Sequence, residues 1–211
     1  MGKTKKEKQS KRVKKGNFGY ISYEKKRRIL MTLLMFSLPI AIYVSGWIYH
    51  GTNKNILTIV AICGCLPACK ATVGVIMMLM HKSLTRSEYD ALSKAHGNLI
   101  CGYELVLTAY EHSAPFNAVA VCGNQLICYT PSQKADASFF EKHIRQIMTA
   151  NNVSNLQIKV FKDQKQYIQR AQSICKNQEQ YRENIKWTPD ERYPDLSRDE
   201  FIYYTLLAIA L

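Results

Sequence analysis

Two long runs of apolar residues dominate the first half of the chain. The first run, residues 29–49, has 21 residues and no charged side chain, and the second, residues 56–80, has 25 residues and one charge. At about 1.5 Å per helical residue, the first run spans about 31 Å, which matches a hydrocarbon core of about 30 Å. Because six residues connect the runs, residues 29–80 are predicted to form a transmembrane hairpin of two antiparallel helices.

After this hairpin the pattern changes to short amphipathic segments. Residues 81–97 are predicted to be a linker helix, because Thr85 and Glu88 fit a capping box. Residues 98–110 are ambiguous between helix and strand, and a strand near 103–108 is favoured. The pair Gly123-Asn124 separates two short apolar segments and therefore predicts a β-hairpin, with strands at 117–122 and 125–130.

Helical and strand patterns alternate in the rest of the chain. Ser138 and Glu141 fit a second capping box and predict an amphipathic helix. Alternation predicts a strand at 156–161, and Asp163 is a suitable N-cap for the next helix. The order β-β-β-α-β-α, followed by a C-terminal helix, predicts a small cytoplasmic α+β domain over residues 98–211 with helices against one sheet.

The C-terminal helix is apolar on every face. Ser197 and Glu200 form a third capping box at its start, and its eleven residues 201–211 reach about 16 Å, too short to span a bilayer. A helix of this kind is normally buried, so it is predicted to pack on its own domain. A partner protein and the membrane interface are the alternatives.

Basic residues predict the orientation of the hairpin. Residues 1–28 hold twelve Lys and Arg against two Glu, whereas the connecting turn holds only Lys54. The positive-inside rule then places both termini of a two-pass cell-membrane protein in the cytoplasm. The first run is also longer than the roughly 7–15 apolar residues of a cleaved signal peptide, and it is therefore interpreted as a retained anchor.

The net charge of +13 belongs mainly to this basic tail, since residues 81–211 carry only +1. Residues 1–28 are predicted to be a basic tail, disordered over residues 1–16 and juxtamembrane after them, that anionic lipids of the inner leaflet attract, by about 1 kcal/mol for each basic residue close to the surface. Its position beside the hairpin favours lipid over nucleic acid. The basic residues that directly precede the helix are the predicted lipid contacts: Lys25, Lys26, Arg27 and Arg28.

Lys70 is the one charged residue inside the second apolar run. An intramembrane charge usually faces protein or water, so Lys70 is a candidate contact for an acidic partner helix, a second copy of this chain or an anionic lipid. Two alternatives remain: the side chain snorkels to the surface, or Pro67 breaks the run into re-entrant halves.

Three cysteines near Lys70 suggest a site for a soft metal, namely Cys63, Cys65 and Cys69. They have no evident fourth ligand, and small residues at Gly64, Ala68 and Thr72 favour close helix packing instead. No metal and no cofactor is therefore predicted, and the three thiols remain weak candidates.

Enzymatic sites are not evident, so catalytic residues stay unassigned and a non-enzyme is favoured. A metal-dependent nuclease needs clustered carboxylates, which the predicted strands 117–122 and 125–130 lack. A thiol hydrolase needs a Cys beside a His, and the pattern does not bring His96, His112 or His143 to a cysteine.

Segments at residues 16–20, 54–58 and 65–70, reading GNFGY, KNILT and CLPACK, carry a family resemblance. On these residues the chain resembles a group of two-pass membrane proteins of Gram-positive anaerobic bacteria that has no assigned activity. The resemblance implies the same topology and no functional residues.

Together these patterns predict a membrane-anchored cytoplasmic domain that binds or regulates another protein at the inner leaflet. The alternatives are a membrane-tethered enzyme, either nuclease-like or thiol-dependent, and a small transport accessory protein with Lys70 in a transport path.

Overall fold

The computed structural model describes residues 13–211 except for 53–54, 110–111, 184, 186 and 188–192. The chain divides into two compact units. One unit contains Ile21–Thr85, and the other combines the segment that ends at Tyr20 with Arg86–Leu211.

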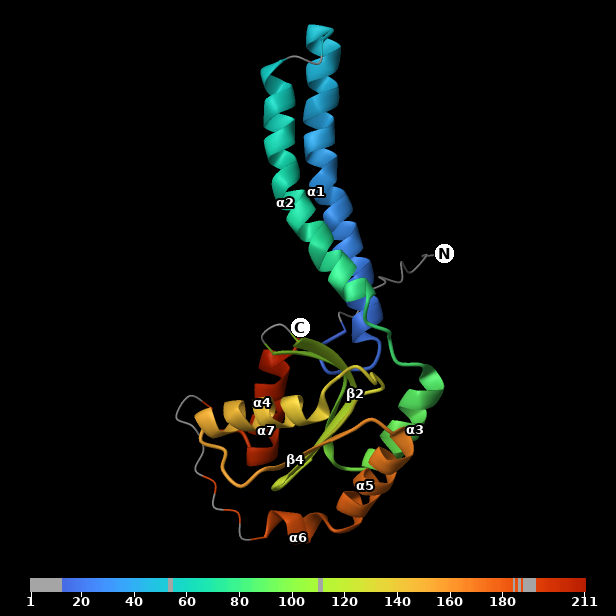
Figure 1. The fold of residues 1–211 in the computed structure, drawn as a ribbon, viewed down its shortest axis with the longest axis vertical. Coiled ribbons are helices and arrows are strands. Elements are labelled where there is room, and N and C mark those ends of the chain that lie inside the picture. Colours follow the sequence, from blue (N-terminus) through green and yellow to red (C-terminus); the bar gives the residue numbers. More distant parts are fainter. Residues whose placement is uncertain (1–12, 53–54, 110–111, 184, 186, 188–192) are drawn as a thin grey trace, which may run out of the picture. The chain divides into compact units, whose positions relative to one another are not determined.

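The first unit is a hairpin of helices α1, Tyr20–His50, and α2, Ile56–Leu79, which run side by side in Figure 1. Both helices are long and apolar enough to cross a membrane, and most of their apolar side chains are exposed. Such extended apolar surface needs a nonaqueous environment, which indicates membrane association. Helix α1 starts nine residues before the apolar run, earlier than predicted.

Small residues allow α1 and α2 to pack closely. A Cβ atom built on Gly64 would lie 3.2 Å from Pro39 Cγ, and one built on Gly46 would lie 2.8 Å from Leu57 Cβ. Ala61 and Ala68 are buried in this seam. The small-residue packing predicted around Gly64 and Ala68 is confirmed.

The second unit contains a four-stranded mixed sheet. Strands β1 (Ile100–Ala109), β2 (His112–Cys122) and β3 (Gln125–Tyr129) are antiparallel neighbours, and β4 (Gln157–Phe161) pairs in parallel with β3. The β-hairpin at Gly123-Asn124 is confirmed, and the predicted order of elements is observed.

The helices lie on both faces of the sheet, so the domain is α/β rather than the expected α+β. Helices α4 (Ala137–Ala150) and α7 (Arg198–Ile209) cover the larger apolar core, whereas α5 (Gln164–Lys176) packs with α3 (Arg86–His96) against the other face. A short α6, Gln178–Arg182, follows α5. A parallel pair needs a crossover, and α4 provides the crossover between β3 and β4 (Figure 1).

In β1, one residue with a left-handed backbone conformation changes the face of the sheet on which the following side chains lie. Glu104 has φ of 54° and is skipped in the pairing of β1 with β2. As a result Tyr103 faces α3 and α5, whereas Leu105, two residues later, belongs to the core under α4 and α7. A strand without this irregularity places residues i and i+2 on the same face.

The segment before α1 packs along the outer edge of β1. The Tyr103 amide donates to Gly16 O at 2.8 Å, and Lys15 Nζ donates to Leu207 O at 3.0 Å and also to Ala210 O. The prediction of disorder over residues 1–16 is thus wrong for residues 13–16, which pack on the domain; residues 1–12 lie outside the described residues. Covering an exposed sheet edge prevents pairing with other chains.

Two of the helix-capping predictions are confirmed and one is wrong. The box of Ser197 and Glu200 is confirmed at α7, and Asp163 caps α5. The box of Ser138 and Glu141 is wrong, because Asp136 caps α4 while Glu141 accepts a hydrogen bond from the Val160 amide at 2.8 Å. Glu141 thereby joins α4 to β4 instead of closing its own helix.

Candidate functional site

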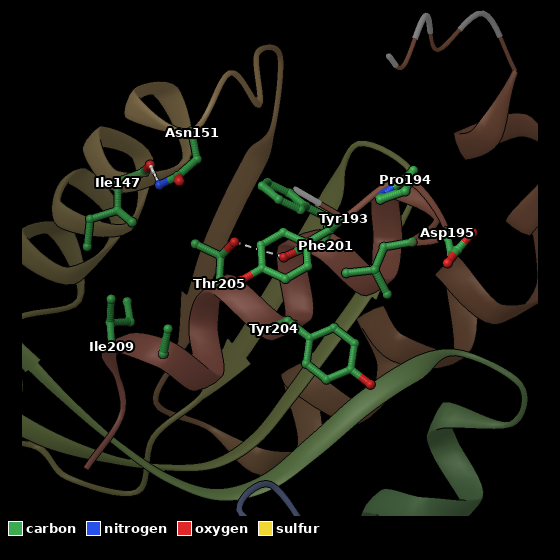
Figure 2. A pocket seen from close by; sticks show the side chains of 11 residues that line it. Ile147, Asn151, Tyr193, Pro194, Asp195, Phe201, Tyr204, Thr205 and Ile209 are labelled. Atoms are coloured by element: carbon green, nitrogen blue, oxygen red, sulfur yellow. Dashed lines mark hydrogen bonds between the residues drawn. The ribbon is translucent and has the colours of Figure 1, made fainter. Parts of the chain in front are cut away.

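An open apolar groove of about 740 Å³ lies between α4 and α7 (Figure 2). Helix α4 contributes Ile147 and Asn151, α7 contributes Tyr204 and Thr205, and residues 193–196 form the remaining wall. The volume falls in the range of about 300–1,000 Å³ that is typical of ligand sites.

The all-apolar character of α7 explains why this groove exists. Ile202 and Leu206 are fully buried in the core, and Tyr203 contacts the segment at Gly16. The helix therefore has a further apolar face, at Tyr204 and the residues beside it, that its own domain does not cover. The prediction that this helix packs on its own domain is confirmed for the first two faces only.

Two tyrosines set the groove apart from the rest of the domain. Tyr193 is 54% exposed and Tyr204 is 52% exposed, and within the described part of the domain they are the only large apolar side chains in the exposed class. Both line the groove. Exposed apolar groups that gather in one concave patch mark binding surfaces, whereas scattered ones do not.

Two polar groups of the groove already donate to backbone carbonyls. The Asn151 amide donates to Ile147 O and the Thr205 hydroxyl donates to Phe201 O, each at 2.8 Å within its own helix (Figure 2). Among the described residues of the lining, Asp195 is the one that carries a charge. This described part of the groove thus offers aromatic and aliphatic contacts with one acidic group in its wall.

The predicted lipid contacts separate into distinct environments in the structure. Arg27 Nη1 and Arg28 Nε both donate to the Glu24 carboxylate, at 3.3 and 3.1 Å, so these two guanidinium groups converge. Lys25 is half-buried and Lys26 is exposed. The sequence treats these four residues as one patch, but the structure brings only Arg27 and Arg28 together on Glu24.

Lys70 is exposed on α2, and the nearby thiols do not form a metal centre. Cys63 and Cys69 are exposed and Cys65 is half-buried. Within the described ranges, no three or more His, Cys, Asp or Glu residues gather in a way that would hold a metal ion. The prediction of Lys70 as a contact residue remains untested.

Three cysteines of the domain are poorly suited to nucleophilic chemistry. All seven cysteines of the chain are free thiols. Burial raises the pKa of the Cys101, Cys122 and Cys128 thiols above the ordinary value. A raised pKa keeps a thiol protonated, whereas the thiolate is the nucleophile.

The three histidines considered as possible bases, His96, His112 and His143, each contact an aromatic ring. His112 and His143 both lie against the Phe139 ring, with centroid separations of 4.8 and 6.2 Å. Buried His96 is bonded through Nδ1 to the Tyr103 hydroxyl at 2.9 Å and through Nε2 to the Tyr167 hydroxyl at 2.8 Å. Tyr110 and Glu111, which precede His112 in the sequence, lie outside the described residues.

Comparison of the chain with protein-family models, curated proteins and solved structures found no match. The groove between α4 and α7 is therefore the strongest candidate site on physical grounds. The sequence does not predict this groove, because residues 147, 193 and 204 come from separate segments. The one available signal is the C-terminal helix, which has more apolar faces than its own domain can bury.

Proposed function

We propose that the chain is a two-pass membrane protein whose cytoplasmic domain binds a segment of a partner protein in the groove between α4 and α7. The anchor would keep that partner at the inner leaflet. The observation that carries the proposal is the pair of exposed tyrosines, Tyr193 and Tyr204, on the walls of one apolar groove. Tyrosines supply large, rigid contact area and are enriched in the hot spots of interfaces.

The chemistry of the groove defines the segment that would fit. Its aromatic and aliphatic lining suits apolar side chains, and the acidic Asp195 suits a Lys or Arg of the bound segment. The Asn151 amide N–H and the Thr205 hydroxyl already donate to backbone carbonyls of α4 and α7, which favours an apolar segment over a polar small molecule. We therefore expect an apolar peptide segment that carries one basic residue.

Site-specific photocrosslinking of the full chain in its native membrane tests this proposal. A photoreactive phenylalanine analogue at position 204 should form an adduct with one defined protein. The same analogue at position 172, exposed on α5 over the opposite face of the sheet, is the matched control. The purified partner should then bind the Tyr204→Ala chain at least about tenfold more weakly, as expected for loss of a hot-spot aromatic residue.

Two results would contradict the proposal. Equal adducts at positions 204 and 172 would show unspecific capture, and an absence of adducts at position 204 would leave the groove without an occupant. An adduct with a second copy of this chain would show that the groove binds this chain itself, in a homo-oligomer, and not a different protein.

A further inference from the structure

A second, smaller cavity lies within the hairpin unit and has a different chemistry. Its volume is about 280 Å³, and its lining includes Arg27, Arg28 and Thr32 of α1 and Ala71 and Gly74 of α2. Gly74 opens this space: a Cβ atom built there would have only Arg28 Nη1 within 4 Å, at 3.9 Å. The cleft thus combines two guanidinium groups, the Glu24 carboxylate and a hydroxyl with the Met31 side chain and the open space at Gly74.

Glu24 organises the two arginines without neutralising them. Its carboxylate is buried, with the residue 7% exposed, and it accepts one bond from each guanidinium group. Two cations against one anion leave a net charge of +1 at the cleft. A guanidinium group has five N–H donors in a rigid planar fork that fits phosphate oxygens, so donors remain for an anion.

The position of the cleft along the hairpin fits a headgroup. Arg28 directly precedes the apolar run 29–49, so the cleft would lie where lipid phosphates lie in a bilayer. Lys70 is four residues before Gly74, about 6 Å along α2 and on the same side of that helix. Lys70 is not among the described residues that line the cleft.

We propose that this cleft is a specific binding site for a phosphate group, supplied by an anionic lipid headgroup of the cytoplasmic leaflet. The proposal rests on the membrane placement given under the proposed function. It goes beyond a general attraction of basic residues to anionic lipid, because it assigns recognition to Arg27, Arg28 and the space at Gly74. Lys25 and Lys26 would add only nonspecific attraction.

Native mass spectrometry of the full chain, purified in a nonionic detergent and titrated with phosphatidylglycerol, measures the binding. We expect one tightly bound lipid on the wild-type chain and at least tenfold weaker binding by R27Q/R28Q. The matched control, K25Q/K26Q, removes the same charge and should change binding less than threefold. Because R27Q/R28Q also leaves Glu24 without its partners, a second pair is needed: G74L fills the cleft and should abolish binding, whereas G74A should retain it.

The outcomes separate the phosphate site from the anchor. Equal weakening by both double variants, or full binding by G74L, would overturn the specific site. Displacement of the lipid by 10 mM inorganic phosphate would assign the cleft to free phosphate and overturn its assignment to lipid. Extraction of the wild-type chain from membranes by alkaline carbonate would instead refute the anchor itself.

Discussion

Acidification should destabilise the α/β domain through one buried histidine. His96 is 1% exposed, and its two ring nitrogens are bonded to the hydroxyls of Tyr103 and Tyr167. Desolvation by burial lowers the pKa of His96 from 6.5 to about 4. The folded domain thus holds this imidazole neutral at pH values at which an unfolded chain would protonate it.

The sign and size of the effect follow from this difference. Between pH 6.5 and pH 4 the unfolded chain binds a proton that the folded chain does not, so the free energy of unfolding decreases as the pH falls. Each unit of pKa difference corresponds to about 1.4 kcal/mol. The lowered pKa of His96 should therefore cost about 3 kcal/mol between pH 7 and pH 4, a large fraction of the 5–15 kcal/mol typical of a domain.

Urea unfolding of the full chain in detergent micelles at pH 7, 6, 5 and 4 measures this loss. Trp187, whose ring centroid lies 5.2 Å from that of Phe201, reports on the domain once Trp47 is replaced by Phe. The control adds His96→Phe together with phenylalanine at the two tyrosines, which removes the titrating ring and leaves no buried hydroxyl unpaired.

Carboxylate titration is common to both chains and cancels in their difference. The free energy of unfolding of the histidine-containing chain, relative to the control, should fall by about 3 kcal/mol as the pH decreases from 7 to 4. A difference that does not change with pH would refute the assignment to His96.

Four further substitutions, one of them a control, test individual features. Gly123→Ala places a Cβ atom against the Tyr181 carbonyl at a residue with φ of 57°, and it should lower the melting temperature strongly. Its control, Gly19→Ala, has φ of 85° and open space around the added Cβ atom, so it should cost only the backbone strain of about 1–2 kcal/mol. Equal losses of stability in both variants would show that the contact with Tyr181 is irrelevant. Ser197→Ala removes the capping box of α7 and should cost about 1 kcal/mol in urea unfolding; an unchanged midpoint would contradict that role. Lys70→Leu should leave carbonate resistance and the photocrosslink from α7 unchanged, since Lys70 is exposed on α2; loss of the crosslink would move the partner contact into the hairpin.

Local signals predicted the elements whose structure depends on neighbouring residues. The apolar runs marked both long helices, Gly123-Asn124 marked the β-hairpin, and Asp163 marked the start of α5. Each of these signals acts within a few residues, through burial length, turn geometry or capping. The full length of β2 was missed because Pro115 disfavours a strand, but β3 pairs with β2 only from Ala118 onwards.

Features that depend on distant residues were not predicted. Lys15 reaches the carbonyls at the end of α7, 192 or more positions away in the sequence, and so the basic tail appeared to be disordered. Glu141 fits a capping box by spacing, yet β4 offers it the Val160 amide. The separation of Arg27 and Arg28 from the two preceding lysines depends on Glu24 and on the approach of Gly74 from the second helix.

Labelling with a membrane-impermeant PEG-maleimide most directly tests the anchored topology on which the proposed function depends. Three full-length chains are compared in intact and in permeabilised cells: wild type, Thr52→Cys in the turn between α1 and α2, and Gln172→Cys on α5; both sites are exposed. Relative to wild type, Thr52→Cys should gain one increment of mass in intact cells, whereas Gln172→Cys should gain its increment only after permeabilisation. Labelling of Gln172→Cys in intact cells, or protection of Thr52→Cys in them, would contradict a hairpin that crosses the membrane twice and leaves the domain in the cytoplasm.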